Sequence, residues 1–458
     1  MSQPRIVILA AGKGTRMHSK RPKVLHEIMG KPMIEYVVEE AKKLSPSRIV
    51  VVTGHEKELV EERLKDAGLS FAAQEEQKGT AHALLTAEAM IADGQAMDQA
   101  TGDVLVLYGD VPLTRAETLR AFFAFFRRSE GVAFMTTAVS DPTGYGRVIM
   151  DGEDIRDIVE DADADASQKK IREINTGICM LGKEMLPLVR QIKAENAKGE
   201  YYLTDICTIA RARGISVKGY HHDEAQEVLG INTRKDLLEA NRVMRERILA
   251  QHMDQGVTLL GEGIYIESGV RIGRDTVIFP CSFLRGKTII GEGATIGPHV
   301  VINDSVLGDN VTIEPFSSLD GLTAEAGVSI GPFSRIRPTT VLKKGVKIGN
   351  FVEVKNSVIM EKSKANHLSY IGDADVGKGV NIGAGTITCN YDGKKKYKTT
   401  IEDGVFVGSN TELVAPVRVG KDAIIGAGST ITHDVPEGAL AVSRVKQKHI
   451  EGYARRKK

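Results

Sequence analysis

The chain has 458 residues, with 61 Lys and Arg, 60 Asp and Glu, and a formal net charge of +1 at pH 7. This length is too great for one hydrophobic core, and the balanced charge excludes a strong field for nucleic acid or an anionic membrane. The four cysteines have no paired spacing, so we expect reduced thiols in a cytoplasmic protein rather than disulfides or a zinc site.

Up to residue 232 the sequence alternates strand-like and helix-like stretches. Apolar runs predict strands over 5–9, 48–53 and 104–108, and helices are predicted from Pro32 and over 56–67, 79–91 and 114–127. Continuous apolar strands between helices favour a Rossmann-like α/β domain, with a parallel sheet covered on both faces. Ligands bind such sheets at the carboxyl ends of the strands. The apolar run over 6–11 is too short for a signal peptide or a membrane span.

A linking helix is predicted over 233–256, between a domain at 1–232 and a second domain at 257–458. Thr233 and Asp236 have the spacing of a capping box at the start of this helix. The chain therefore divides into two folded parts of different character.

The second part, from about 257 to 442, repeats an isoleucine or valine followed by glycine at intervals close to six residues, as at 290–291 and 296–297. A fixed period indicates a solenoid, here a parallel β-helix in which each unit contributes one strand and one turn. We expect the aliphatic side chain in the core and the glycine in a turn with positive φ. The repeat is interrupted by a polar, basic insertion at 389–400, and such insertions map to loops on one face, often the binding face. Its lysines, 394–396, are typical of a solvated loop.

A glycine-rich turn directly follows the first predicted strand, in the string LAAGKGTRM at 9–17, with Lys23 close behind it. The backbone N–H groups of such a turn can bind phosphate oxygens, and Arg16 and Lys23 can add charge-assisted hydrogen bonds. The glycine spacing matches neither a Walker loop nor the dinucleotide-binding fingerprint. The loop alone is weak evidence, but the whole string with the following Pro-Lys is more specific.

This string resembles the signature of sugar nucleotidyltransferases, and the Tyr-Gly-Asp at 108–110 resembles the metal-binding position of that family. Further similar strings lie at 74–80 (QEEQKGT), 144–147 (GYGR), 173–177 (EINTG), 199–205 (GEYYLTD) and 230–232 (GIN). With the attached solenoid they resemble, over nearly the whole chain, the bacterial bifunctional family that unites a UDP-N-acetylglucosamine pyrophosphorylase with a glucosamine-1-phosphate N-acetyltransferase. The resemblance implies a left-handed β-helix, Mg²⁺ as cofactor, UTP and acetyl-CoA as cosubstrates, and a homotrimer that serves cell-envelope polysaccharide synthesis.

The resemblance also implies roles for residues of the first site. Asp110 and Asn232 would hold Mg²⁺, while Lys23 and Arg16 would stabilise the triphosphate and the leaving pyrophosphate. The attacking sugar 1-phosphate is already an anion, so positioning and charge neutralisation replace a general base. The nucleotide-sugar contacts would be Leu9, Ala10, Ala11, Gly12, Lys23, Gln74, Gly79, Thr80, Tyr108, Gly109, Asp110, Gly146, Glu160, Asn175 and Asn232. Taken alone, Asp110 is equally typical of a turn cap, and Glu160 of a solvated acidic loop.

A second candidate site lies in the solenoid at 366–372 (NHLSYIG), just before the insertion. Attack on a thioester needs a neutral amine, and an imidazole can accept the amine proton near pH 7. His367 alone is more typical of a polar turn; its position and the resemblance make it the general base, with Glu353 orienting the histidine or the substrate. The resemblance assigns sugar-phosphate binding to Arg337, Lys355, Tyr370, Asn381, Asn390 and Tyr391, and acetyl-CoA binding to Ala384, Ser409, Ala427 and Arg444.

Two other interpretations remain open at this stage. A single-activity sugar-1-phosphate nucleotidyltransferase with an inert solenoid would not need the polar pairs at 366–367 and 390–391. A non-catalytic regulatory subunit would be free to lose Lys23, Asp110 and His367. We therefore expect an enzyme that acetylates glucosamine 1-phosphate and then transfers UMP from UTP to the product, giving UDP-N-acetylglucosamine and pyrophosphate.

Overall fold

The computed structural model describes residues 3–91, 102–128 and 131–457. Contacts within the chain divide it into two compact units, 1–244 and 245–458. The division falls inside helix α9 (Arg234–Asp254), so the three predicted domain ranges stay a prediction. All four cysteines are free, as expected. In the described ranges, no helix has the length and apolar character needed to cross a membrane.

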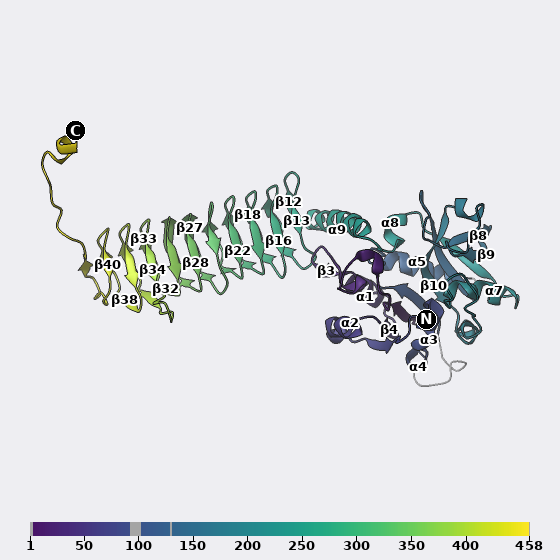
Figure 1. Cartoon of the computed structure of the whole chain (residues 1–458). Coiled ribbons are helices and arrows are strands. Elements are labelled where there is room, and N and C mark those ends of the chain that lie inside the picture. Colours follow the sequence, from purple (N-terminus) through teal and green to yellow (C-terminus); the bar gives the residue numbers. More distant parts are fainter. Residues whose placement is uncertain (1–2, 92–101, 129–130, 458) are drawn as a thin grey trace. The chain divides into compact units, whose positions relative to one another are not determined.

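The first unit is built on a nine-stranded sheet with the order β5-β4-β1-β6-β10-β7-β11-β9-β8, of which Figure 1 labels β4, β10, β9 and β8. Its strands are β1 (Arg5–Leu9), β4 (Arg48–Thr53), β5 (Ser70–Ala73), β6 (Val104–Tyr108), β7 (Val132–Ala138), β8 (Arg147–Asp151), β9 (Asp154–Val159), β10 (Glu173–Leu181) and β11 (Val217–His221). The predicted parallel arrangement is confirmed for β5, β4, β1 and β6. The expectation of a parallel sheet fails beyond these strands, because β10, which is not among the predicted strands, runs antiparallel to both β6 and β7; the sheet is mixed.

Both faces of this sheet are covered, which explains the continuous apolar strands. In β1, Val7 and Leu9 belong to one core cluster, while Ile6 and Ile8 belong to another. A strand with two buried faces gains burial energy at every position, so no polar alternation is seen. The helices of the unit are α1 (Met33–Lys42), α2 (Lys57–Leu64), α3 (Thr80–Thr86), α4 (Glu88–Ile91), α5 (Ala116–Phe126), α6 (Leu186–Val189), α7 (Ile206–Arg211) and α8 (Ala225–Val228).

The predicted capping box at the start of α9 is confirmed. The Asp236 backbone N–H donates to Thr233 Oγ1 at 3.2 Å, and the Thr233 N–H donates to Asp236 Oδ2 at 2.8 Å. The Asn232 N–H donates to the same carboxylate oxygen at 2.9 Å. The cap therefore fixes the backbone of Asn232, one of the predicted metal ligands.

The second unit is a left-handed parallel β-helix made of three parallel sheets, each of which takes every third strand (Figure 1). One sheet contains β12 (Thr258–Leu259), β15 (Val277–Ile278), β18 (Thr295–Ile296), β21 (Thr312–Ile313), β24 (Ser329–Ile330), β27 (Lys347–Asn350), β30 (Lys364–His367), β33 (Asn381–Ile382), β36 (Phe406–Val407), β39 (Ile424–Ile425) and β41 (Leu440–Ala441).

The second sheet contains β13 (Tyr265–Ile266), β16 (Phe283–Arg285), β19 (Val301–Asn303), β22 (Ser318–Asp320), β25 (Arg335–Ile336), β28 (Glu353–Lys355), β31 (Tyr370–Gly372), β34 (Ile387–Cys389), β37 (Glu412–Val414) and β40 (Thr430–Ile431). The third contains β14 (Arg271–Ile272), β17 (Ile289–Ile290), β20 (Val306–Leu307), β23 (Thr323–Ala324), β26 (Val341–Leu342), β29 (Val358–Ile359), β32 (Ala374–Val376), β35 (Thr399–Ile401) and β38 (Val417–Val419). Each strand pairs in register with the strand one coil later, as expected for stacked six-residue units.

The repeated glycines have a different physical cause from the one predicted. Neither Gly291 nor Gly297 has positive φ; the left-handed residues follow them, at Gly293 (65°) and His299 (56°). A Cβ on Gly291 would lie 2.7 Å from the carbonyl carbon of Gly308 in the next coil. The prediction that the motif glycine makes the turn is therefore wrong for these two positions. The close backbone of the following coil is what excludes a side chain.

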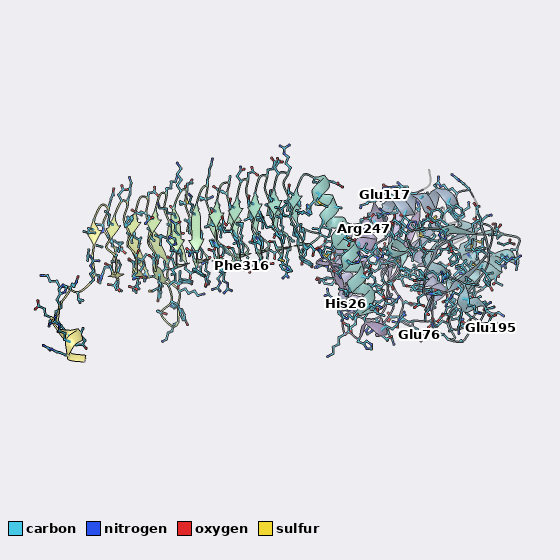
Figure 2. The ribbon with its side chains drawn as sticks, turned by 90° about the horizontal axis from the view of Figure 1, so that it is seen from above. His26, Glu76, Glu117, Glu195, Arg247 and Phe316 are labelled. Atoms are coloured by element: carbon cyan, nitrogen blue, oxygen red, sulfur yellow. The ribbon has the colours of Figure 1, made fainter. Side chains whose placement is uncertain are left out.

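One corner of the β-helix carries an exposed apolar column, formed by His299, Phe316, Phe333, Phe351 and Leu368. All five residues have positive φ, which is rare for bulky side chains. The aromatic rings stack almost in parallel, with centroid separations of 4.9, 5.0 and 5.3 Å. The three phenylalanines are still about half exposed (48–56%), and Figure 2 labels Phe316 at the edge of the solenoid. We call this feature the stacked column.

Candidate active sites

The carboxyl ends of β1, β4 and β6 meet at a cavity of about 960 Å³ in the first unit. The glycine-rich turn enters it directly from β1, because Leu9 is the last residue of that strand. Predicted contacts that line the cavity are Leu9, Ala10, Ala11, Gly12, Lys23, Gln74, Gly79, Thr80, Tyr108 and Asp110. Gly109 lies behind this surface, where its N–H donates to the Leu9 carbonyl at 2.9 Å. The structure thus brings together residues from four separate strings of the sequence.

A cation centre lies at the cavity wall, around the ammonium of Lys23. This group donates to Asp110 Oδ2 and, at 3.0 Å, to Asn232 Oδ1. Arg16 Nη2 donates to the same Asn232 oxygen at 2.9 Å. A carboxylate oxygen and an amide oxygen therefore converge on one positive charge, and hard oxygen donors of this kind fit a divalent cation of the Mg²⁺ class. Such a cation keeps coordination positions for water and phosphate, so two protein ligands are sufficient.

The predicted sugar contacts Gly146, Glu160 and Asn175 form a neighbouring cluster rather than lining this cavity. The Asn175 N–H donates to the Gly146 carbonyl at 2.9 Å, and a Cβ on Gly146 would lie 3.3 Å from Glu160 Oε1. Burial raises the pKa of Glu160 above its ordinary value. Burial also raises the pKa of the Tyr108 hydroxyl, and Glu160 adds to that effect. Tyr108 lines the cavity and also lies against β10, the strand of Asn175, because a Cβ on Gly177 would lie 2.7 Å from its ring.

In the second unit, His367 is exposed at the end of β30, and its ring is held from one side. His367 Nδ1 lies 2.7 Å from Asn350 Oδ1, and the two residues are paired in register between β27 and β30. An amide oxygen can only accept, so Nδ1 carries the proton and Nε2 keeps its lone pair. Glu353 does not make this bond; its carboxylate accepts from Arg337 Nη1 at 3.1 Å. The structure therefore gives His367 a defined tautomer in which Nε2 can accept a proton.

Cationic and polar groups lie on neighbouring strands and in the insertion. The Lys355 ammonium lowers the pKa of Lys396, so two ammonium groups lie close together, an arrangement that favours binding of an anion. Tyr370 is paired in register with Glu353, and its hydroxyl lies 3.5 Å from Asn390 Nδ2. Asn390 also donates to Asp373. These contacts place most of the predicted sugar-phosphate group together.

The predicted acetyl-CoA residues follow one edge of successive coils. The N–H of Asn410 donates to the Ala384 carbonyl at 2.7 Å, and the N–H of Gly428 donates to the Ser409 carbonyl at 2.8 Å. The Arg444 guanidinium reaches the Ala427 carbonyl. Of the remaining two sugar-phosphate candidates, Asn381 lies in β33, and exposed Tyr391 donates its hydroxyl to Gly393 at 2.6 Å.

Comparison with known proteins matches both halves of the chain. Residues 6–193 match the MobA-like NTP transferase domain, and 269–304, 287–321 and 398–433 match the bacterial transferase hexapeptide (six repeats). Bifunctional protein GlmU of Thermus thermophilus is 48% identical over 455 residues, which cover 98% of each chain. The same protein of Thermotoga petrophila is 50% identical over 456 residues, which cover 99% of each chain. The chain belongs to the bifunctional GlmU family.

Membership of the GlmU family confirms the predicted family and both fold types. The protein is a bifunctional enzyme, a uridylyltransferase and an N-acetyltransferase that together produce UDP-N-acetylglucosamine from small-molecule substrates. The nucleotidyltransferase half requires a divalent metal. The two interpretations that gave the chain one activity or none are therefore set aside.

The structure of this GlmU family member also reveals site residues that had no predicted role. Lys13, Gln77 and Glu200 belong to the motif strings, and His55 and Glu56 lie outside them; all five line the first cavity. In the solenoid, Asn350 and Lys396 join the predicted groups. Asn350 precedes His367 by 17 residues, which is one coil, so the repeat period would have identified it once the strand register was known.

Proposed function

We propose that the first unit transfers UMP and that the solenoid transfers acetyl, within domains at 1–232 and 257–458 joined by the helix over 233–256. The observation that carries this assignment is that the two constellations share no residue and lie in separate compact units. One is a cation centre around Lys23 beside a glycine-rich turn. The other is an imidazole with its Nδ1 hydrogen bond satisfied.

In the uridylyl site, the turn binds the UTP phosphates through backbone N–H groups that follow Ala10, because the Ala10 N–H already donates to the Val52 carbonyl at 2.9 Å. Asp110 and Asn232 would hold Mg²⁺, which when bound neutralises charge on the phosphate oxygens. An oxygen of N-acetylglucosamine 1-phosphate forms a bond to the α-phosphorus, and the bond from that phosphorus to the pyrophosphate breaks. Lys23 and Arg16 stabilise the negative charge of the phosphates and of the departing pyrophosphate. No proton has to be removed from the nucleophile.

In the acetyl site, Arg337 and Lys355 bind the phosphate of glucosamine 1-phosphate, and the edge from Ala384 to Arg444 binds acetyl-CoA. His367 Nε2 accepts the proton that the sugar amine loses as its nitrogen attacks the thioester carbon. The carbon–sulfur bond breaks as the amide forms, and the CoA thiolate leaves and takes up a proton. Acetylation precedes uridylyl transfer, since the product of the first reaction is the substrate of the second.

Asn350→Ala should lower kcat for acetyl transfer about tenfold, with little change in the KM for acetyl-CoA. Loss of the Asn350 acceptor frees the ring to rotate and to place its proton on Nε2, which a base cannot use. Thiol release measures the rate. The matched variant Asn350→Asp keeps an acceptor at the same place and should retain most activity; wild-type activity in Asn350→Ala would contradict the assigned tautomer.

We further propose a homotrimer in which the acetyl site lies against a neighbouring copy. Two features support it: His367 is exposed in the single chain, and the stacked column, whose last residue Leu368 follows it directly, presents apolar side chains to solvent. An exposed apolar strip beside an open site is typical of an interface.

Phe333→Asp should separate the trimer and lower acetyl transfer at least tenfold, while uridylyl transfer continues. A carboxylate in the middle of the stacked column would be buried without a partner on assembly, at a cost of several kcal/mol per chain. Light scattering after gel filtration gives the mass. The control is Leu59→Asp, a similar change at a similarly exposed position in the first unit. A Phe333→Asp protein that stays trimeric would show that the stacked column is not the interface.

Two assays on the intact enzyme test the assignment. One follows thiol release from acetyl-CoA with glucosamine 1-phosphate, and the other follows pyrophosphate release from UTP with N-acetylglucosamine 1-phosphate. We expect a chelator to stop the second reaction and spare the first, and Mg²⁺ to restore it. Chelator sensitivity of both reactions would contradict a metal confined to the first unit. We also propose a cytoplasmic location, which the four free cysteines support.

A further inference from the structure

Gln74 is held rigidly at the wall of the first cavity. It follows the last residue of β5, and its backbone N–H donates to the Thr53 carbonyl at 2.7 Å. The residue is 4% exposed, yet it lines the cavity. Its side chain can therefore present only one end of the amide to a ligand.

The hydrogen bonds of Gln74 decide which end this is. Its Nε2 lies 3.2 Å from the Gly79 carbonyl oxygen and 2.9 Å from His82 Nδ1. A carbonyl oxygen can only accept, so the NH₂ group must face Gly79, and its second hydrogen points at the His82 lone pair. His82 then carries its proton on Nε2. In the part of the chain that is described, Gln74 Oε1 has no hydrogen-bond partner, so an acceptor is left for the cavity.

His82 is held in place by the helix on which it lies, on the side of Gln74 that faces away from the cavity. It lies in the first turn of α3, which begins after Gly79. Gly79 has φ of 109°, and a Cβ there would lie 2.6 Å from the Tyr201 carbonyl oxygen, to which the Ala81 N–H donates at 2.9 Å. The start of the helix is thereby locked to the 201 segment. His82 does not line the cavity, so it acts on a ligand through Gln74.

We propose that His82 is a positioning residue that sets the base selectivity of the uridylyl site by fixing the Gln74 amide. The inference rests on the proposed function, in which Gln74 faces the base of UTP. Uracil presents an N3–H donor beside a carbonyl acceptor, which fits an acceptor at Gln74 Oε1 and the N–H donor of Gly79. Cytosine presents an acceptor at N3. A cytosine bound in the same position would therefore place N3 against Gln74 Oε1, two acceptors with no hydrogen between them. Without His82, one of the two hydrogen bonds that hold the Gln74 amide is lost. The amide can then rotate and present its NH₂ group, a donor, to cytosine N3.

The test is the ratio of kcat/KM for UTP to that for CTP, measured by pyrophosphate release on the intact enzyme. His82→Leu keeps bulk but removes the acceptor, and should lower the ratio roughly 3- to 10-fold, the size of one neutral hydrogen bond. His82→Asn keeps an acceptor bonded to Cγ, as Nδ1 is, and should retain the ratio within about twofold. A purely structural role would lower both kcat/KM values together and leave the ratio unchanged.

A double-mutant comparison separates this inference from the proposed function. Gln74→Leu should itself lower the ratio, and adding His82→Leu to it should have no further effect, because His82 acts only through the amide. A lower ratio in Gln74→Leu but not in His82→Leu would overturn the role of His82 and leave the uracil contact standing. An equal loss in His82→Asn and His82→Leu would also overturn it. No change in any variant would overturn the role of Gln74 and that of His82 together.

Discussion

Asp110→Ala should lower the rate of uridylyl transfer roughly 10³-fold or more, while acetyl transfer continues at the wild-type rate. The Asp110 carboxylate is the one anionic partner that the described contacts give to Lys23, and with Asn232 it forms the oxygen pair proposed to bind Mg²⁺. Its removal takes away a metal ligand and leaves the lysine without a counter-charge when UTP is absent. A loss of about 4 kcal/mol in transition-state stabilisation corresponds to this factor.

Pyrophosphate release at saturating Mg²⁺ measures the effect, and thiol release in the same preparation reports on the solenoid. Asp110→Asn keeps the shape and one oxygen but not the charge, so it should be intermediate and require more Mg²⁺. Asp151→Ala is a matched control, because Asp151 is an exposed carboxylate of the same unit, paired with Arg156. Equal loss of both activities in Asp110→Ala, with the fold intact, would refute separate sites.

His367→Ala should do the reverse and lower acetyl transfer about 10²- to 10⁴-fold without affecting uridylyl transfer. Those factors are typical of a general base, which here removes the proton of the sugar amine. The residual rate should rise with pH, because an amine that has already lost its ammonium proton depends less on the enzyme. Thiol release over a pH series measures both effects.

His433→Ala provides the control for this variant, because His433 is an exposed histidine of the same β-helix that contacts Thr432 and none of the proposed site residues. It should retain full acetyl transfer. A trimeric His367→Ala enzyme with the wild-type rate and pH profile of acetyl transfer would contradict the proposal, because another group would then have to accept the amine proton.

Local sequence was sufficient for those parts of the fold where neighbouring residues decide the outcome. The strands 5–9, 48–53 and 104–108 have the predicted bounds, because burial on both faces makes each of them a nearly continuous apolar run. The capping box at Thr233 and Asp236 is also local, since its two partners are three residues apart. β10 is not among the predicted strands, and its antiparallel direction depends on pairing with strands far away in the sequence.

In the candidate sites, too, residues within a local motif could be predicted, and residues placed by contacts between distant segments could not. Motif strings named ten residues that line the first cavity, because a motif preserves residue types at a strand end. Asn350 was missed because its bond to His367 depends on the register between coils, and Glu353 was named for a bond that Asn350 makes. Lys396 is exposed, as predicted for a solvated loop, but its proximity to Lys355 depends on how the insertion folds and could not be read from the sequence.

Gly349 shows how the tight stacking of coils lets a substitution in one coil affect a site residue in the next. It has no side chain and no chemistry, but a Cβ there would collide with the backbone of Asn366, 2.6 Å from its carbonyl carbon, directly before His367. Its neighbour Asn350 holds the imidazole. A substitution at this repeat glycine would displace the next coil rather than its own, so a change that looks architectural in the sequence would appear in an assay as a catalytic defect.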